Sequence, residues 1–152
     1  MENICLLSNV LQRDERKQLI ENSQSLFVVT NNAQTPSILH LHYKFIPILN
    51  HLLSAISHRT ELKLEMISAW MLRTRGKEED VSWHNHLKSG ADYSMVYYVK
   101  SPLFFTGTSF RHGFVRASQN SMILFPSCLE HASPRHPLGI ERYVLSADLK
   151  VK

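Results

Sequence analysis

Apolar residues in the first third of the chain recur with the spacing of α-helices. Between residues 37 and 57 they fall three or four positions apart, which predicts a helix with one buried stripe: Ile38, Leu41, Phe45, Ile48, Leu49, Leu52, Leu53 and Ile56. Pro47 is expected to kink or split this helix, because proline lacks the backbone N–H that the helix interior needs. Good helix formers predict a second helix over 13–23, and a short strand follows over 26–30.

From residue 62 onward the pattern changes to that of β-strands. Apolar and charged side chains alternate first, and the run to Met71 predicts one long strand. Turn residues then separate further apolar runs, which predict strands over 93–100, 103–106, 109–117, 121–125 and 141–149. Helices followed by many short antiparallel strands favour a mainly β (α+β) fold, a barrel or jelly roll with N-terminal supporting helices. We predict a single domain over 1–152, with a helical part over 1–60 and a β core over 61–150.

The composition is that of an ordinary globular protein. The chain has 152 residues, the size of one domain, and 43% of them are hydrophobic. The longest apolar stretch, 37–56, is interrupted by polar residues and falls short of the roughly 20 apolar residues that a membrane span needs. The start of the chain has no basic region followed by a long apolar one, so we expect no secretory signal. Cys5 and Cys128 do not make a disulfide framework, and we expect a reducing, cytoplasmic location.

The net charge of +4 raises the question of nucleic-acid binding. The basic residues are spread along the chain, however, and the longest basic run is the short segment 73–77. Such a distribution indicates solubility and weak association, so nucleic acid is not the partner we predict. The nine histidines are more unusual, and imidazole is a good ligand for transition metals.

Two histidines stand two positions apart just before the predicted strand 93–100. If Trp83–His86 is extended, His84 and His86 point to the same face and can both bind one metal ion. A chance H-x-H is also expected in a histidine-rich chain. His40 and His42 form such a pair, but within the predicted helix residues two apart do not share a face.

Two later residues complete a candidate site. His131 follows an apolar strand that ends in a proline turn, where it could supply a third ligand, or else be an ordinary surface histidine. Arg142 begins an apolar strand, and a guanidinium there is costly unless it pairs with an anion such as a carboxylate. The alternative is an exposed arginine on an edge strand. His136, between Arg135 and Pro137, is interpreted as a solvated loop residue.

With these residues in view, the sequence resembles the 2-oxoglutarate- and Fe(II)-dependent oxygenases, in particular small bacterial and phage members with an H-x-H, S-x-V-Y-Y, F-P-S-x-x-x-H and R pattern. The matching segments are 84–86, 94–98, 125–131 and Arg142, and the resemblance covers about residues 62–149. It implies a double-stranded β-helix, a cupin-like jelly roll, and a dioxygenase that hydroxylates an unidentified small molecule, amino acid or peptide side chain.

The resemblance also implies a role for each matching residue. His84, His86 and His131 would bind Fe(II), and Arg142 and Tyr98 would hold the distal carboxylate of 2-oxoglutarate. Tyr98 could equally be a core-packing residue. The family usually has Asp or Glu where this chain has His86, and Asp92 and Asp80 are the alternatives for the missing acid.

Other interpretations remain open at this stage. A cupin-type metalloenzyme would share the barrel and the histidines but would not need 2-oxoglutarate or Arg142. A non-catalytic binding module on the same barrel would bind no metal. The loops 87–92 and 132–139 are expected to flank the mouth of the site and to select the substrate. The sequence leaves open whether the protein is a monomer or a homodimer.

Overall fold

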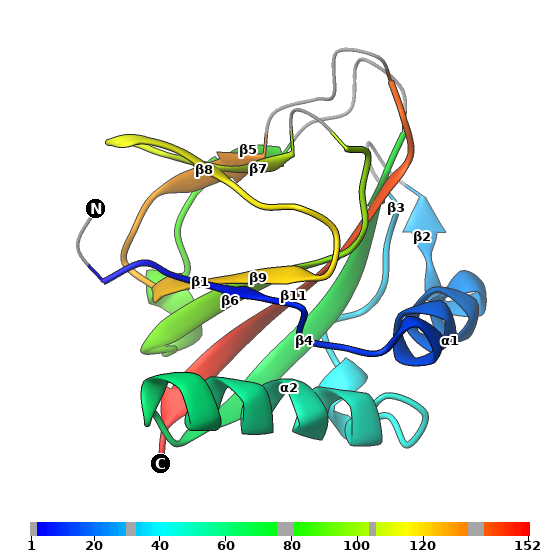
Figure 1. Ribbon diagram of the computed structural model, residues 1–152, viewed down its shortest axis with the longest axis horizontal. Coiled ribbons are helices and arrows are strands. Elements are labelled where there is room, and N and C mark those ends of the chain that lie inside the picture. The colour runs from blue at the N-terminus through cyan, green and yellow to red at the C-terminus, as the bar shows by residue number, and fades with distance from the viewer. Residues whose placement is uncertain (1–2, 30–32, 76–80, 104–105, 134–138) are drawn as a thin grey trace.

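The structure, a computed structural model, describes residues 3–29, 33–75, 81–103, 106–133 and 139–152. Two antiparallel sheets face each other, and helices cover the outer face of the larger one (Figure 1). The larger sheet contains, in order, β1 (Cys5–Ser8), β9 (Ser121–Pro126), β6 (Tyr93–Lys100), β11 (Arg142–Val151), β4 (Leu64–Thr74), β3 (Ala33–Gln34) and β2 (Val28–Val29). The smaller sheet contains, in order, β5 (Val81–His84), β10 (His131–Ser133), β7 (Gly107–Phe110) and β8 (Gly113–Arg116). This is the layered arrangement expected from the strand pattern.

The central strands of the larger sheet are buried on both faces. Neighbouring side chains on a strand point to opposite faces, so Tyr97 packs in the core on the helix side and Tyr98 packs between the two sheets. Leu145 and Val144 divide in the same way. This double burial explains why β6, β9 and β11 are nearly continuous apolar runs in the sequence.

Two helices pack against the outer face of the larger sheet (Figure 1). They are α1 (Arg13–Ser23) and α2 (Ile46–Thr60), and the short 3-10 helices are η1 (Gln24–Leu26), η2 (Leu39–Leu41) and η3 (Leu87–Ser89). The predicted helix over 13–23 is confirmed as α1. The N-terminal third is not only helical, because β1 pairs with β9 and β3 pairs with β4. The helix-side core includes Leu19, Phe45, Ile48, Leu52, Ile56, Met71 and Leu149.

The predicted helix over 37–57 is wrong in its first half. Residues 39–41 form η2, and the main helix starts at Ile46 with Pro47 in its first turn. Proline is well suited to that position because its missing N–H would have no partner there in any case. The segment before it bonds to the sheet instead, with the backbone N–H of Ala69 donating to the Ser37 carbonyl. His40 therefore lies in a 3-10 turn rather than in an amphipathic helix.

The strand predictions are confirmed at the centre of the fold and fail at its edge. The segments 93–100, 121–125 and 141–149 lie in β6, β9 and β11 to within a residue or two at each end, and the long strand β4 runs from Leu64 to Thr74. The predicted single strand over 109–117 is wrong, because the chain turns at Arg111 and His112 to form the β7–β8 hairpin. In the predicted strand 103–106, Leu103 and Thr106 are not in a strand, and the residues between them lie outside the described part of the chain.

Two expectations about the chain as a whole can be compared with the structure. Cys5 and Cys128 are free and exposed, in agreement with the prediction of no disulfide framework. Within the described ranges, no helix combines the length and the apolar character that crossing a membrane requires.

Candidate metal centre

The structure brings together three histidines from two segments of the chain. His84 is the last residue of β5, and antiparallel pairing places His131, the first residue of β10, directly opposite it. His86 lies just beyond β5, where η3 begins, so the strand ends two residues before the end of the expected extended segment 83–86. The three rings nevertheless converge: one ligand atom from each histidine lies within 4.8 Å of the other two. The ring centroids are 4.2 Å apart for His84 and His131, and 5.0 Å apart for His84 and His86.

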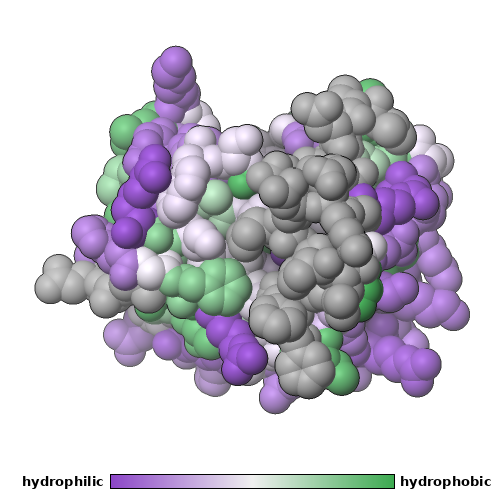
Figure 2. All heavy atoms as spheres, turned by 90° about the horizontal axis from the view of Figure 1, so that it is seen from above, coloured by the Kyte–Doolittle hydropathy of each residue, from purple (hydrophilic) through white to green (hydrophobic). Residues whose placement is uncertain are grey.

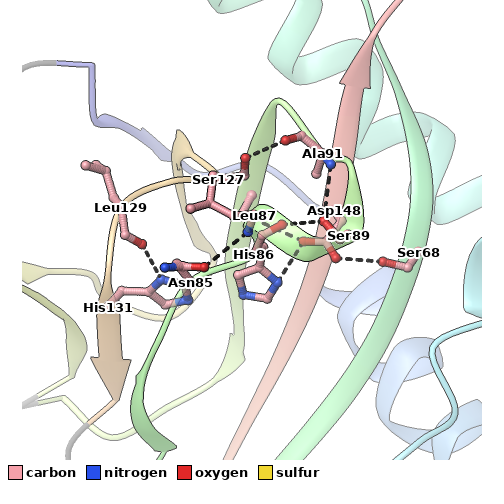
Figure 3. A network of polar contacts seen from close by, with 11 residues as sticks. Ser68, Asn85, His86, Leu87, Ser89, Ala91, Ser127, Leu129, His131 and Asp148 are labelled. Carbon is pink, nitrogen blue, oxygen red and sulfur yellow. Dashed lines mark hydrogen bonds and ion pairs between the residues drawn. The ribbon is translucent and has the colours of Figure 1, made fainter.

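Each imidazole is oriented by a hydrogen bond from its Nδ1 atom. Nδ1 of His84 lies 2.7 Å from the Ser82 carbonyl oxygen, and Nδ1 of His131 lies 3.0 Å from that of Leu129. Carbonyl oxygens only accept hydrogen bonds, so both Nδ1 atoms carry the proton. The lone pair of each ring is then on Nε2, as metal binding requires. Figure 3 shows this contact for His131 and the corresponding one for His86.

The environment keeps His131 neutral. Its pKa is lowered to about 4, mainly by burial and also by the neighbouring His84 and His86, against the raising effect of the Leu129 carbonyl and Asp148. A neutral imidazole is the form that binds metal, so His131 is ready to act as a ligand over the whole physiological pH range. The ring of Phe125 packs edge-on against it, with centroids 4.7 Å apart.

The partner of His86 is Asp148, a residue that the sequence analysis did not identify. Its Oδ1 atom lies 2.9 Å from Nδ1 of His86, and its side chain is only 5% exposed. Burial alone would raise the pKa of Asp148, but hydrogen bonds from His86, Ser68 and Ser94 lower it below the ordinary value. The carboxylate is therefore ionised behind the imidazole of His86 (Figure 3). Trp70 stacks on the same imidazole, with centroids 5.8 Å apart.

Arg142 is buried, and two of its guanidinium nitrogens have no partner in the described part of the chain. The residue is 2% exposed at the start of β11, and its Nε and Nη1 atoms have no hydrogen-bond acceptor among the described residues. Burial lowers its pKa, while the nearby Tyr98 raises it. Buried polar atoms in proteins are almost always paired, so this guanidinium is suited to receive an anion that comes from outside the chain.

Tyr98 lies near Arg142, in the core cluster between the two sheets. It is fully buried, and its hydroxyl is 2.7 Å from Oγ1 of Thr108 on β7. Burial raises its pKa to about 12, with Thr108 and Arg142 acting in the opposite direction. The hydroxyl thus stays protonated and is available as a hydrogen-bond donor near the guanidinium.

A cavity of about 640 Å³ lies between the sheets. All three histidines line it, together with Trp70, Thr108 and Val144. Arg142 and Tyr98 are not among its lining residues. The hydroxyl of Tyr98 is hydrogen-bonded to Thr108, which does line the cavity. Figure 2 shows the molecule from above, and the coloured residues on this face are a mixture of hydrophilic and hydrophobic ones without a broad hydrophobic area.

Asp92, one of the two acids considered as an alternative ligand, is not grouped with the histidines. The carboxylate of Asp92 accepts a hydrogen bond from the backbone N–H of Val151, 2.8 Å away. Asp80 and His136 lie outside the described residues. Of the two loops expected at the mouth, 132–139 contributes Ala132 and Ser133 to the cavity, and none of the residues of 87–92 is among those that line it. In the ranges that the structure describes, the three histidines are the only group of three or more metal-ligating side chains.

Comparison with known proteins supports the fold. No protein-family model matches the sequence, and no curated protein matches it. Among solved structures, the viral collagen prolyl hydroxylase from Paramecium Bursaria Chlorella virus-1, in complex with 2-oxoglutarate, matches with a TM-score of 0.72 and 14% identity over 99% of this chain and 97% of its own. HygX from Streptomyces hygroscopicus, with nickel, 2-oxoglutarate and hygromycin B bound, matches with a TM-score of 0.72 and 12% identity over 99% of this chain and 83% of its own.

A third match is SnoN, a non-heme alpha ketoglutarate dependent epimerase from nogalamycin biosynthesis, with a TM-score of 0.73 and 11% identity over 98% of this chain and 78% of that one. The fold is a double-stranded β-helix. The predicted fold class is thereby confirmed, and at the level of the fold the matches agree with the resemblance found in the sequence. The three matches extend over nearly the whole of this chain.

Proposed function

We propose that this protein is an Fe(II)- and 2-oxoglutarate-dependent dioxygenase. The observation that carries the proposal is the pairing of two features between the same two sheets. One is a set of three imidazoles whose Nδ1 atoms are all engaged, which leaves Nε2 for a metal. The other is the buried guanidinium of Arg142, two nitrogens of which lack an acceptor among the described residues. A cosubstrate that chelates a metal at one end and carries a carboxylate at the other satisfies both.

The donor set fits these groups. Imidazole nitrogen is a good ligand for iron, and three protein ligands on a six-coordinate ion leave room for a chelating cosubstrate. When bound, Fe(II) and 2-oxoglutarate would supply the oxidising chemistry. His84, His86 and His131 would hold the ion, and Arg142 would bind the distal carboxylate in two-point contact. Tyr98 would donate a hydrogen bond to the same carboxylate, and the apolar walls formed by Phe125 and Val144 would exclude water.

The proposed reaction consumes one 2-oxoglutarate and one dioxygen for each turnover. Loss of carbon dioxide from 2-oxoglutarate gives succinate, which takes up one oxygen atom. The second oxygen atom accepts two electrons from the substrate, which is hydroxylated or otherwise oxidised. The cavity of about 640 Å³ is larger than the cosubstrate requires, so a small molecule, an amino acid or a peptide side chain can share it. The collagen and hygromycin B named for two of the solved structures belong to these classes.

The test is formation of succinate from 2-oxoglutarate in air. Protein loaded with Fe(II) is expected to release succinate slowly without added substrate, and removal of the metal with a chelator should stop the reaction. His131→Ala is the matched inactive variant. Absence of 2-oxoglutarate binding to the Fe(II)-loaded protein would contradict the proposal.

The same experiment separates the other interpretations. A cupin-type metalloenzyme would bind the metal but not 2-oxoglutarate, and a non-catalytic binding module would bind neither. Nε and Nη1 of Arg142, which find no acceptor within the described ranges, favour the oxygenase, because a cupin-type site gives no reason to bury a guanidinium without partners for these atoms. We also propose a cytoplasmic location, with which the two free cysteines agree, and size-exclusion chromatography would decide between a monomer and a homodimer.

A further inference from the structure

A buried carboxylate lies directly behind one of the three candidate ligands. Asp148 is 4% exposed near the end of β11. Its Oδ1 atom accepts hydrogen bonds from Nδ1 of His86 at 2.9 Å and from Oγ of Ser94 at 3.2 Å, and its Oδ2 atom accepts one from Oγ of Ser68 at 3.0 Å. Both oxygens are therefore engaged, and Asp148 is not among the side chains grouped as metal ligands, which are the three histidines.

The position of this carboxylate is fixed by the larger sheet. Asp148 on β11 lies directly opposite Ser68 on β4 and Ser94 on β6, so both serine hydroxyls come from neighbouring strands at the same level. The sheet thus holds the carboxylate in place, and its remaining partner is the imidazole of His86 (Figure 3). Burying an ionised carboxylate is unfavourable unless it is well hydrogen-bonded, and here three donors surround it.

The chemistry of the ligand set gives this arrangement a purpose. Three neutral imidazoles do nothing to reduce the charge of a divalent ion, which would leave two positive charges in a partly apolar cavity. An anion hydrogen-bonded to a ligand imidazole offsets one of these charges and makes the imidazole a stronger donor to the metal. It also fixes the tautomer, since only an Nδ1–H imidazole can donate to Asp148 and present Nε2 to the ion.

We propose that Asp148 is a positioning residue of the metal centre, which holds His86 as a ligand and supplies the negative charge that the three imidazoles lack. The inference rests on the proposed function, because it requires that the three histidines bind a metal. It goes beyond that proposal, because it states that a residue which does not touch the ion increases the affinity of the site for the metal. The metal is expected to bind at His84, His86 and His131, and Asp148 acts through His86.

Two substitutions at Asp148 separate charge from geometry. Asp148→Asn keeps an oxygen that can accept the hydrogen bond from His86 but removes the charge, and Asp148→Ala removes both. Asp92→Asn is the matched control, since it removes one carboxylate from a residue bonded to the Val151 backbone instead of to the site. Changes to such supporting groups typically weaken metal binding by about 10- to 100-fold, so we expect about 10-fold for Asp148→Asn and about 100-fold for Asp148→Ala. Asp92→Asn should match the wild type.

The experiment is a titration of each metal-free protein with Co(II). The visible absorption of the bound Co(II) reports binding, so the measurement does not depend on catalytic turnover. Circular dichroism would show that each variant is folded at the temperature used. In addition, NMR of the metal-free protein should show the Nδ1 proton of His86 at low field in the wild type and not in Asp148→Ala. A carboxylate with only a structural role would change stability while leaving the affinity for Co(II) unchanged.

The outcomes distinguish this inference from the proposed function. If the wild type binds no Co(II), both are overturned. If the wild type and Asp148→Asn bind Co(II) equally well, only the role of Asp148 is overturned. If His86→Ala retains full affinity while Asp148→Ala loses it, the carboxylate binds the ion directly, and the inference is again wrong.

Discussion

Arg142 has surroundings that a folded chain alone does not explain. Its guanidinium is buried at the start of β11, and Nε and Nη1 have no partner among the residues that the structure describes, although Tyr98 lies close enough to affect its pKa. An unpaired buried charge is strongly unfavourable, and proteins keep one where a ligand will pair with it. Removing the charge of Arg142 should therefore maintain or raise the stability of the ligand-free protein and lower its affinity for the anion.

Arg142→Met tests this relation. The variant keeps much of the side-chain volume and loses the charge, so without 2-oxoglutarate its free energy of unfolding should equal or exceed that of the wild type. Its affinity for 2-oxoglutarate should fall by about 10- to 100-fold, because charged hydrogen bonds contribute roughly 1.5–3 kcal/mol. Chemical denaturation and calorimetric titration of the metal-loaded protein measure the two quantities. A clear loss of stability together with unchanged 2-oxoglutarate affinity would show that the guanidinium is structural.

At the residue scale the sequence indicated the parts of the site that have a local signature. His84 and His86 stand two apart, and Arg142 is a charge in an apolar strand. Asp148 has the same signature as Arg142, an ionised residue between Ala147 and Leu149, and it could have been found by the same reasoning. What the sequence could not show is which group it meets, because the contact with His86 joins residues far apart in the chain.

At the scale of elements, the β7–β8 hairpin supports one strand of the candidate metal centre. Phe110 at the end of β7 lies opposite His131, so the hairpin holds the strand that carries the third histidine. Gly107 begins this hairpin with φ +152°, and a Cβ atom there would lie 2.1 Å from the Val115 carbonyl oxygen. No side chain fits at that position unless the two strands move apart.

Gly107→Ala should therefore destabilise the protein, and Gly113→Ala is its matched control. Gly113 has a similar φ of +149°, but a Cβ atom there meets nothing within 4 Å. The two variants share the backbone strain and differ in the clash, so Gly107→Ala should lose about 1–3 kcal/mol more free energy of unfolding than Gly113→Ala. Urea denaturation measures the difference. Equal losses in the two variants would mean that the hairpin accommodates the methyl group.

The limits of an element could be predicted where a strand is buried on both faces. They could not be predicted where they depend on partners that are far away in the sequence. β6 is buried on both faces, and its apolar run has the same limits in sequence and structure. The start of α2 was misplaced because the stripe of apolar residues continues upstream of Pro47 into a segment that bonds to β4 instead. The turn of the β7–β8 hairpin, at Arg111 and His112, has none of the usual turn residues at its centre.

At the scale of the whole molecule, the candidate site joins the two sheets. The three histidines come from β5 and β10 of the smaller sheet and from the segment just after β5, while Arg142 and Asp148 belong to β11 of the larger one. A metal and cosubstrate bound across this space would contact both layers. Because the unfolded chain cannot present such a site, binding should stabilise the folded state of the entire protein.

Thermal unfolding measures this coupling. At a concentration of 100 times the Kd, a ligand stabilises the folded state by about 2.7 kcal/mol, which is roughly 5–10 °C in Tm for a chain of this size. We expect Co(II) to raise Tm, and 2-oxoglutarate to raise it further only when the metal is present. Removal of the metal with a chelator should reverse both shifts. A shift caused by 2-oxoglutarate in the absence of metal would place its binding site elsewhere.

The most direct measurement is anaerobic titration of the Fe(II)-loaded protein with 2-oxoglutarate, followed by visible absorption. Chelation of the metal by the keto acid gives a weak charge-transfer band, which should appear in the wild type and saturate. The band should be absent in His131→Ala and should require much more 2-oxoglutarate in Arg142→Met. If the wild type gives no band, 2-oxoglutarate does not chelate the bound metal and the proposed function is wrong. If changing His84 and His131 together to alanine leaves metal binding intact, the three histidines are not the metal centre.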